Sequence, residues 1–229
     1  IKDMLYGVGV GTYAVPAGML LPDFEGLYKP AELNTIPLVG SRKVTNVWNF
    51  SEDFSNADWS KVNSSVTSDA VAGPFGGTLA DKLVESTDTS SHYLRQNYVI
   101  NLSSRHAVTV YAKAGERTVL QLASFQTGNQ YVNFDLGAGV ISQKGPQMST
   151  TDCGILDVGN GWYRCYASLQ PSGAGTIGVE VTNSTTSGHN ASYLGDGVSG
   201  IYLWGAQLED VTGQTNQNPS EYIPTDTVG

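Results

Sequence analysis

A ten-residue stretch, 157–166, constrains the fold more than any other part of the sequence. Asn160 and Gly161 at its centre suit a tight turn, because Gly has no Cβ and Asn tolerates positive φ. The chain is therefore predicted to reverse there as a β-hairpin. After the turn, successive side chains of residues 162–169 point to opposite faces of a strand, and one of these faces is apolar. The other face carries Trp162, Arg164 and Tyr166.

Two cysteines flank this turn, and their relation depends on the register of the hairpin. Pairing centred on Gly159 places Cys153 opposite Cys165, where a disulfide is possible. Pairing centred on Asn160 places Cys153 opposite Ala167. The alternative to a disulfide is a pair of small buried thiols. No histidine lies near them in the sequence, so the two sulfurs do not predict a zinc site.

Short alternating stretches separated by turn residues fill most of the chain. The breaks between them are rich in Gly, Pro, Asn and Ser, which favour turns. No stretch shows a convincing amphipathic helix pattern, so the fold is predicted to be all-β and antiparallel, a sandwich or a barrel. Strands are expected at 79–84, 93–100, 106–114, 118–124, 130–135, 140–143, 153–158, 162–169, 176–182 and 200–209.

Composition supports this fold class and excludes some partners. Charged residues are only 14% of the chain, with 27 Gly and 12 Tyr, which favours a turn-rich β protein. The net charge of −9 and only 12 scattered basic residues argue against nucleic-acid binding. No run of 18 apolar residues is present, so no membrane insertion is expected. No signal peptide is evident, and because the chain begins at Ile1 we expect a processed or partial product.

Residues 1–45 differ from the rest of the chain. Prolines interrupt the segment too often for a helix of normal length, so it is predicted to be an extended arm. Few polar residues stand among its apolar residues, so the apolar residues would form an exposed patch. We therefore expect the arm to dock on a neighbouring subunit or larger particle, or alternatively to fold back on its own sandwich. The assembly residues are expected to be Tyr6, Tyr13, Leu20, Phe24 and Tyr28.

Seven short motifs are spread in order over residues 42–225. They are Arg42 to Asn46, Ser51 to Trp59, Ala80 to Leu83, Tyr111 to Lys113, Asp157 to Cys165, Gly200 to Glu209 and Ser220 to Thr225. Together they resemble the carbohydrate-binding-module-like (lectin-like) jelly-roll domain of phage and prophage tail-fibre, tailspike and other virion proteins. The resemblance implies an antiparallel jelly-roll β-sandwich over 46–229 behind the N-terminal arm, a place on the virion, homotrimeric assembly and contact with host-surface glycans.

Sugar binding uses aromatic rings for the apolar faces of pyranoses and planar polar side chains for their hydroxyls. Strand parity places such residues opposite the apolar faces. A jelly roll has two outer faces, so the candidate residues either divide between these faces or lie together on one of them. The alternatives for Trp162 and Arg164 are a lid on the sandwich, an ion pair or a subunit contact. The candidate carbohydrate-binding residues are Tyr111, Gln121, Tyr131, Asn133, Trp162 and Arg164.

No catalytic residue, cofactor or metal is predicted. Glycosidases need two carboxylates across a cleft, and Asp135 with Glu180 or Glu209 is the pair that the sequence leaves open. The three histidines, at 92, 106 and 189, lie far apart without a catalytic motif. Related modules often hold a structural Ca²⁺ through acidic residues in the last strand, where this chain has Trp204 and Gly205. Glu52, Asp53 and Glu209 are either substitute Ca²⁺ ligands or surface carboxylates.

These observations lead to one functional prediction and one alternative. The prediction is a non-enzymatic phage virion protein, of tail-fibre, spike or head-fibre type, whose jelly roll binds host-surface glycans. Its arm would anchor it to other virion proteins. The alternative is a structural decoration or connector protein of the capsid or tail, which uses the same β-sandwich for subunit contacts.

Overall fold

The computed structural model describes residues 44–76, 79–100, 104–125, 130–149, 152–170 and 175–226. The predicted arm over residues 1–45 therefore falls almost wholly outside the described residues, together with Tyr6, Tyr13, Leu20, Phe24 and Tyr28. Val44–Gly229 forms a compact unit of its own. The homotrimer stays a prediction.

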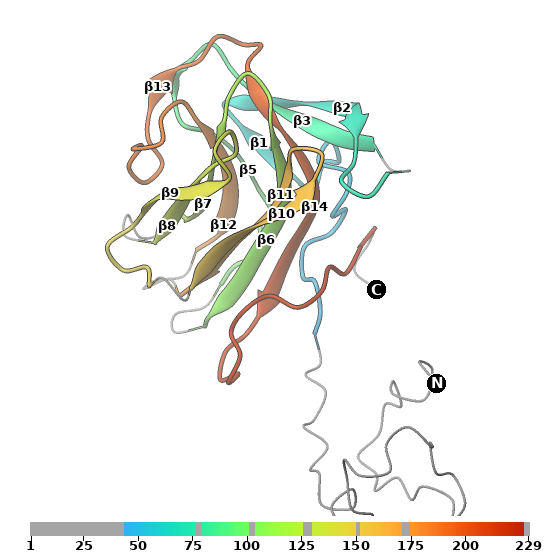
Figure 1. Cartoon of the computed structure of the whole chain (residues 1–229), viewed down its shortest axis with the longest axis vertical. Helices are drawn as coiled ribbons and strands as arrows, with labels where there is room; N and C mark the ends of the chain where they lie inside the picture. Colours follow the sequence, from blue (N-terminus) through green and yellow to red (C-terminus); the bar gives the residue numbers. More distant parts are fainter. Residues whose placement is uncertain are drawn as a thin grey trace, which may run out of the picture. The chain divides into compact units, whose positions relative to one another are not determined.

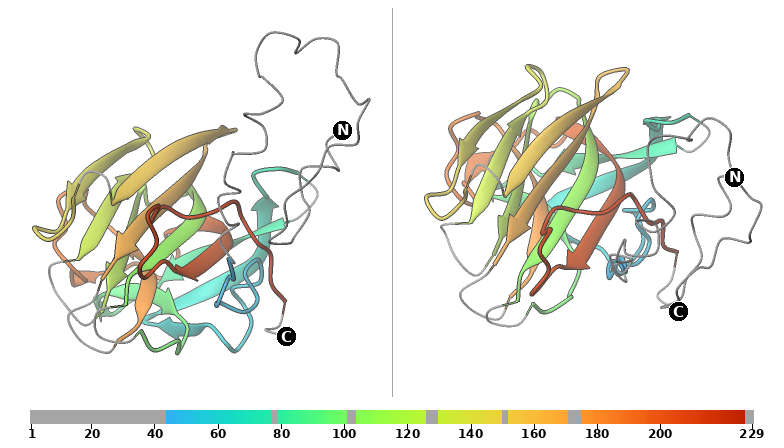
Figure 2. Two further views of the ribbon diagram at one scale, coloured as in Figure 1. Left: turned by 90° about the horizontal axis from the view of Figure 1, so that it is seen from below. Right: turned by 60° about the horizontal axis from the view of Figure 1, so that its bottom comes forward.

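Two six-stranded antiparallel sheets face each other in this unit (Figures 1 and 2). The first sheet has the order β1 (Ser60–Val62), β5 (His92–Arg95), β12 (Ile177–Thr182), β7 (Val119–Ser124), β8 (Tyr131–Asp135) and β9 (Val140–Lys144). The second has the order β10 (Cys153–Gly159), β11 (Trp162–Leu169), β6 (His106–Ala114), β14 (Gly200–Asp210), β3 (Leu79–Glu85) and β2 (Ser64–Ala72). A small third sheet pairs β4 (Thr89–Ser90) with β13 (Tyr193–Leu194).

The chain passes repeatedly from one sheet to the other, as in a jelly roll: β6 to β7, β9 to β10 and β11 to β12. No helix occurs among the described residues, and thus none that could span a membrane. The all-β antiparallel sandwich predicted from the sequence is confirmed.

The core lies between the two sheets and follows from the period-2 alternation of the strands. Val108 and Val110 on β6 face Leu120 and Leu122 on β7, all with no exposed surface. Alternate residues point outward, as predicted. At one end of the core, three aromatic rings from the segment before β1 pack together, with Trp48 and Phe54 each about 5 Å from Trp59. This segment is thereby fixed to the sandwich.

The hairpin at residues 157–166 forms with the register centred on Asn160. Cys153 lies opposite Ala167, and Cys165 lies opposite Ile155. Asn160 and Gly161 adopt φ of 56° and 77°, the left-handed conformation that the turn requires. Both cysteines are unbonded and buried. The register therefore separates the two sulfurs that the alternative pairing would have joined.

Asn46 closes the sandwich where the described chain enters it. Its side chain is 2% exposed and makes four hydrogen bonds to the backbone. The amide nitrogen donates to the carbonyls of Ala206 and Ile223, both at 3.0 Å. The amide oxygen accepts from the N–H groups of Trp48 at 3.1 Å and Leu208 at 3.0 Å. One side chain thus joins the entry segment (residues 44–59), β14 and the C-terminal segment (residues 211–226).

Replacing Asn46 by Ala should lower the free energy of unfolding by about 3 kcal/mol, because several buried backbone groups would lose their partners. Urea denaturation of the purified protein would measure this. Asn183→Ala, at an exposed asparagine, is the control and should change stability by less than about 0.5 kcal/mol. Equal stabilities of the two variants would contradict the role given to Asn46.

Candidate functional site

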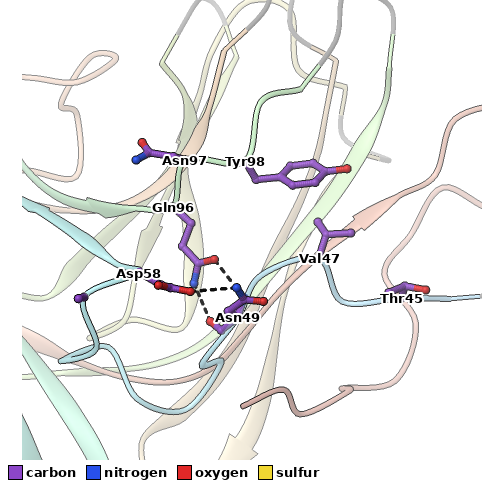
Figure 3. Close-up of a pocket in the computed structure, with 8 residues that line it drawn as sticks. Thr45, Val47, Asn49, Asp58, Gln96, Asn97 and Tyr98 are labelled. Carbon is purple, nitrogen blue, oxygen red and sulfur yellow. Dashed lines mark hydrogen bonds between the residues drawn. The ribbon is translucent and has the colours of Figure 1, made fainter. Parts of the chain in front are cut away.

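An open groove of about 540 Å³ lies between the segment that enters the sandwich and the residues that follow β5 (Figure 3). Its walls come from residues 45–58 and 96–98, so parts of the chain far apart in sequence form one site. The lining residues are Thr45, Val47, Asn49, Ala57, Asp58, Gln96, Asn97 and Tyr98.

Asn49 ties the two walls of the groove together (Figure 3). Its backbone N–H donates to Gln96 Oε1 at 3.0 Å, and Gln96 Nε2 donates back to the Asn49 carbonyl at 2.6 Å. The Asn49 side-chain nitrogen donates to Asp58 Oδ2 at 2.9 Å. The positions of the amides and of the carboxylate are therefore set before any ligand binds.

Tyr98 supplies the aromatic surface of the groove. Its half-buried ring lies near Val47, while the Asn97 side chain points to the other side of the chain (Figure 3). Burial, and secondarily the charge of Asp210, raise the pKa of the Tyr98 hydroxyl, so it stays protonated at neutral pH. An aromatic ring beside amide and carboxylate groups is the combination that holds pyranose rings and their hydroxyls.

The outer face of the first sheet carries a row of polar side chains on adjacent strands, which we term the polar row: Tyr93, Glu180, Gln121 and Asn133. Gln121 Nε2 donates to Asn133 Oδ1 at 2.7 Å. Residues 183–190, termed the covering segment, lie over this row. Its carbonyls at Ser187 and Gly188 accept from Asn133 at 2.7 Å and Gln121 at 2.9 Å.

Tyr131 belongs to the same outer face and is also covered. It is 6% exposed, and its ring lies 6.0 Å from that of His189 in the covering segment. Its hydroxyl accepts from Gln143 Nε2 at 2.7 Å. Three of the sequence candidates, Gln121, Tyr131 and Asn133, are thus brought together, but their polar groups bind the protein's own chain.

Glu180 is the unusual member of the polar row. Its side chain has no exposed surface, and neither carboxylate oxygen has a hydrogen-bond partner among the described residues. Burial without a compensating partner raises the pKa of the Glu180 carboxyl to about 8. At neutral pH the group is therefore a neutral carboxylic acid.

The other three candidates lie on the outer face of the second sheet, beneath the C-terminal segment. Tyr111 and Trp162 are 5% and 1% exposed and pack with Trp204. The Tyr222 ring lies 4.9 Å from Trp204, and Arg164 donates to the Ser220 carbonyl at 2.5 Å. The C-terminal segment, red in Figure 1, follows β14 as it makes these contacts. The candidates therefore divide into two groups on opposite sides of the sandwich.

The carboxylates considered for catalysis do not lie across one cleft. Glu180 is on the outer face of the first sheet and Glu209 on that of the second, and stacked sheets lie about 10 Å apart even before their outward side chains are counted. Asp135 is two strands and two residues from Glu180, roughly 12 Å between Cα atoms. Asp135 also accepts from the backbone N–H of Gly137 at 2.9 Å.

The carboxylates considered for Ca²⁺ have separate roles. Glu52 accepts from the Tyr222 hydroxyl at 3.1 Å, Asp53 accepts from the N–H of Ser55 at 3.0 Å, and Glu209 accepts from the N–H of Ser220 at 2.9 Å. Among the described residues, no group of three or more His, Cys, Asp or Glu side chains is placed to hold a metal ion.

Sequence reasoning missed the groove. The run Gln96-Asn97-Tyr98 was assigned to a strand over 93–100, but β5 ends at Arg95 and the chain continues without strand pairing to Ile100. Two adjacent amides beside a tyrosine, where apolar alternation stops, are the signal that could have revealed this site.

Glu180→Gln should remove a pH dependence of stability. The folded protein keeps the Glu180 proton to about pH 8, whereas the usual pKa is 4.5, so folding takes up a proton between these values. The wild-type free energy of unfolding should therefore fall more steeply than that of the variant as pH rises from 5 to 8, by up to about 1.4 kcal/mol per pH unit. Urea denaturation across this range measures it, with Glu221→Gln as an exposed control. Parallel curves for wild type and Glu180→Gln would refute it.

No family model matches this chain, and no curated protein matches it. Among solved structures, it is similar to the crystal structure of the enzymatically active domain of tailspike protein 4 from bacteriophage CBA120. The identity is 15% and the TM-score 0.40, over 71% of this chain and 21% of the tailspike chain. The chain thus spans about a fifth of the length of that structure.

The similar structure is a domain of a phage tailspike protein, and the resemblance to a carbohydrate-binding module stays a prediction. The comparison contradicts the prediction that the chain is not an enzyme, because the similar tailspike domain is described as enzymatically active. The non-enzymatic role is therefore withdrawn.

Proposed function

We propose that this chain is a phage virion protein whose β-sandwich binds a host-surface glycan in the groove formed by residues 45–58 and 96–98. The observation that carries the proposal is the lining of the groove: one tyrosine ring beside three amides and a carboxylate, in an open depression of about 540 Å³. Such a volume fits a short stretch of sugar residues.

Each part of the lining has a distinct task in this proposal. The Tyr98 ring covers the apolar face of a pyranose, which excludes water from the C–H groups of the sugar. Asn97 is exposed and lines the groove on the other side of the chain from Tyr98, where its amide offers both a donor and an acceptor to the hydroxyls of a sugar that extends beyond the ring. Asp58 accepts two further hydroxyl protons through its carboxylate oxygens, while Asn49 holds it in position at 2.9 Å.

The location on a virion is supported by the seven motifs that resemble the jelly-roll domains of virion proteins. The homotrimer that this resemblance implies would present three grooves on one particle component. Linked sites gain affinity through effective concentration, so weak binding at each groove is sufficient for adhesion.

Asn97→Ala should weaken glycan binding about tenfold, because one or two hydrogen bonds to the sugar are lost from an exposed position that does not support the fold. Tyr98→Ala should weaken it at least as much through loss of the stacking surface. Isothermal titration with polysaccharides extracted from the host surface measures both effects, and circular dichroism verifies that the variants fold.

Asn183→Ala serves as the matched control, since it removes an exposed asparagine that does not line the groove. Unchanged binding in Asn97→Ala and Tyr98→Ala would overturn the groove as the site. Loss of particle assembly in these variants, with glycan adhesion intact, would instead favour the structural role of a decoration or connector protein.

A further inference from the structure

The lining of the groove carries negative charge. Asp58 is the only charged side chain among the eight residues that line it, and it is exposed. Asp210 lies close enough for its charge to act on the Tyr98 hydroxyl. The whole chain adds a net charge of −9. A ligand entering the groove therefore meets negative charge without a lining cation to offset it.

Neighbouring cations are engaged with other groups. Lys61 follows the lining segment in sequence, but its ammonium donates to the carbonyls of Ser55 at 2.7 Å and Asn56 at 2.5 Å. Arg105 lies near Asp210 in the sandwich and pairs with Asp152 at 2.6 Å. Arg95, which directly precedes Gln96, donates to Thr176 Oγ1 at 3.5 Å. These contacts direct all three positive charges to the protein's own oxygens.

We propose that the groove selects uncharged glycans and discriminates against glycans that carry carboxylates, a ligand class that rests on the proposed function of the same groove. A neutral sugar offers hydroxyl protons to Asp58 and to the exposed amide oxygen of Asn97, which satisfies the carboxylate. A uronate offers a second carboxylate, which cannot donate to Asp58 and repels it.

The expected size of the discrimination follows from Coulomb's law. Two carboxylates about 4 Å apart in water repel enough to weaken binding about fivefold, and a partly dry groove strengthens the effect. Further uronate groups within about 10 Å add to it at low salt. We therefore expect a loss of roughly tenfold or more for an acidic polymer at low ionic strength, and a smaller loss in high salt.

Neutral polymers and the uronates made from them by oxidation at C6, which keep the glycosidic linkage, test this inference. Mannan, galactan and glucan are compared with polymannuronate, polygalacturonate and polyglucuronate for binding to the full chain, in low and high salt. At least one neutral polymer should bind, and the affinity for its uronate partner should be lower by roughly tenfold or more. We call this difference in affinity the gap. Asp58→Asn should narrow this gap several-fold. Asp88→Asn removes the same charge from an exposed position outside the lining, and should leave the gap unchanged.

The outcomes separate the two proposals. Uronate polymers that bind as tightly as their neutral partners, or more tightly, would overturn the charge selectivity and leave glycan binding standing. A gap that Asp58→Asn and Asp88→Asn reduce equally would show that net charge, and not the groove, causes the discrimination, and would also overturn the inference. If none of the six polymers bound, glycan binding at the groove would itself fail, and the selectivity with it.

Discussion

The sandwich depends on a single apolar layer between its two sheets. Each strand contributes alternate side chains to this layer. A shift of the strand register by one residue would expose these side chains to solvent. The layer therefore fixes the register of strands that are distant in sequence. The outward side chains of both sheets take no part in this layer, and part of each outer face is covered by another part of the same chain: the covering segment on the first sheet and the C-terminal segment on the second. The groove lies apart from both covered regions, between the segment that enters the sandwich and the residues after β5.

Local patterns were sufficient to predict most strands. The ranges expected at 106–114 and 162–169 agree with β6 and β11 at both ends, because alternation and turn residues are properties of a few neighbouring residues. The order of strands within the sheets was not predictable in this way. β6 pairs with both β11 and β14, and these contacts join residues that are 49 to 104 positions apart. The register of the Cys153 hairpin was left open for a related reason, since two turn centres one residue apart both satisfy the local pattern.

For the candidate site residues, too, local features were predictable and long-range contacts were not. Parity correctly placed Gln121 and Trp162 outward from the core, but it could not show that other segments cover them. Coverage is a long-range property: Gln121 is bound by a carbonyl 67 residues away, and Arg164 by one 56 residues away. The groove was missed because its residues interrupt a strand pattern, and sequence reasoning read that interruption as the continuation of a strand.

The hydrogen bonds between Asn49 and Gln96 give the groove a thermodynamic property of its own. Because these bonds join its two walls in the absence of a ligand, and a third bond holds Asp58, the backbone beside Asn97 and the Asp58 side chain have already lost much of their conformational freedom. This loss of entropy is part of the free energy of folding, so it does not weaken the binding of the sugar. A rigid pair of walls also limits adaptation, so the groove would distinguish sugars by the orientation of their hydroxyls more sharply than a flexible loop of the same composition.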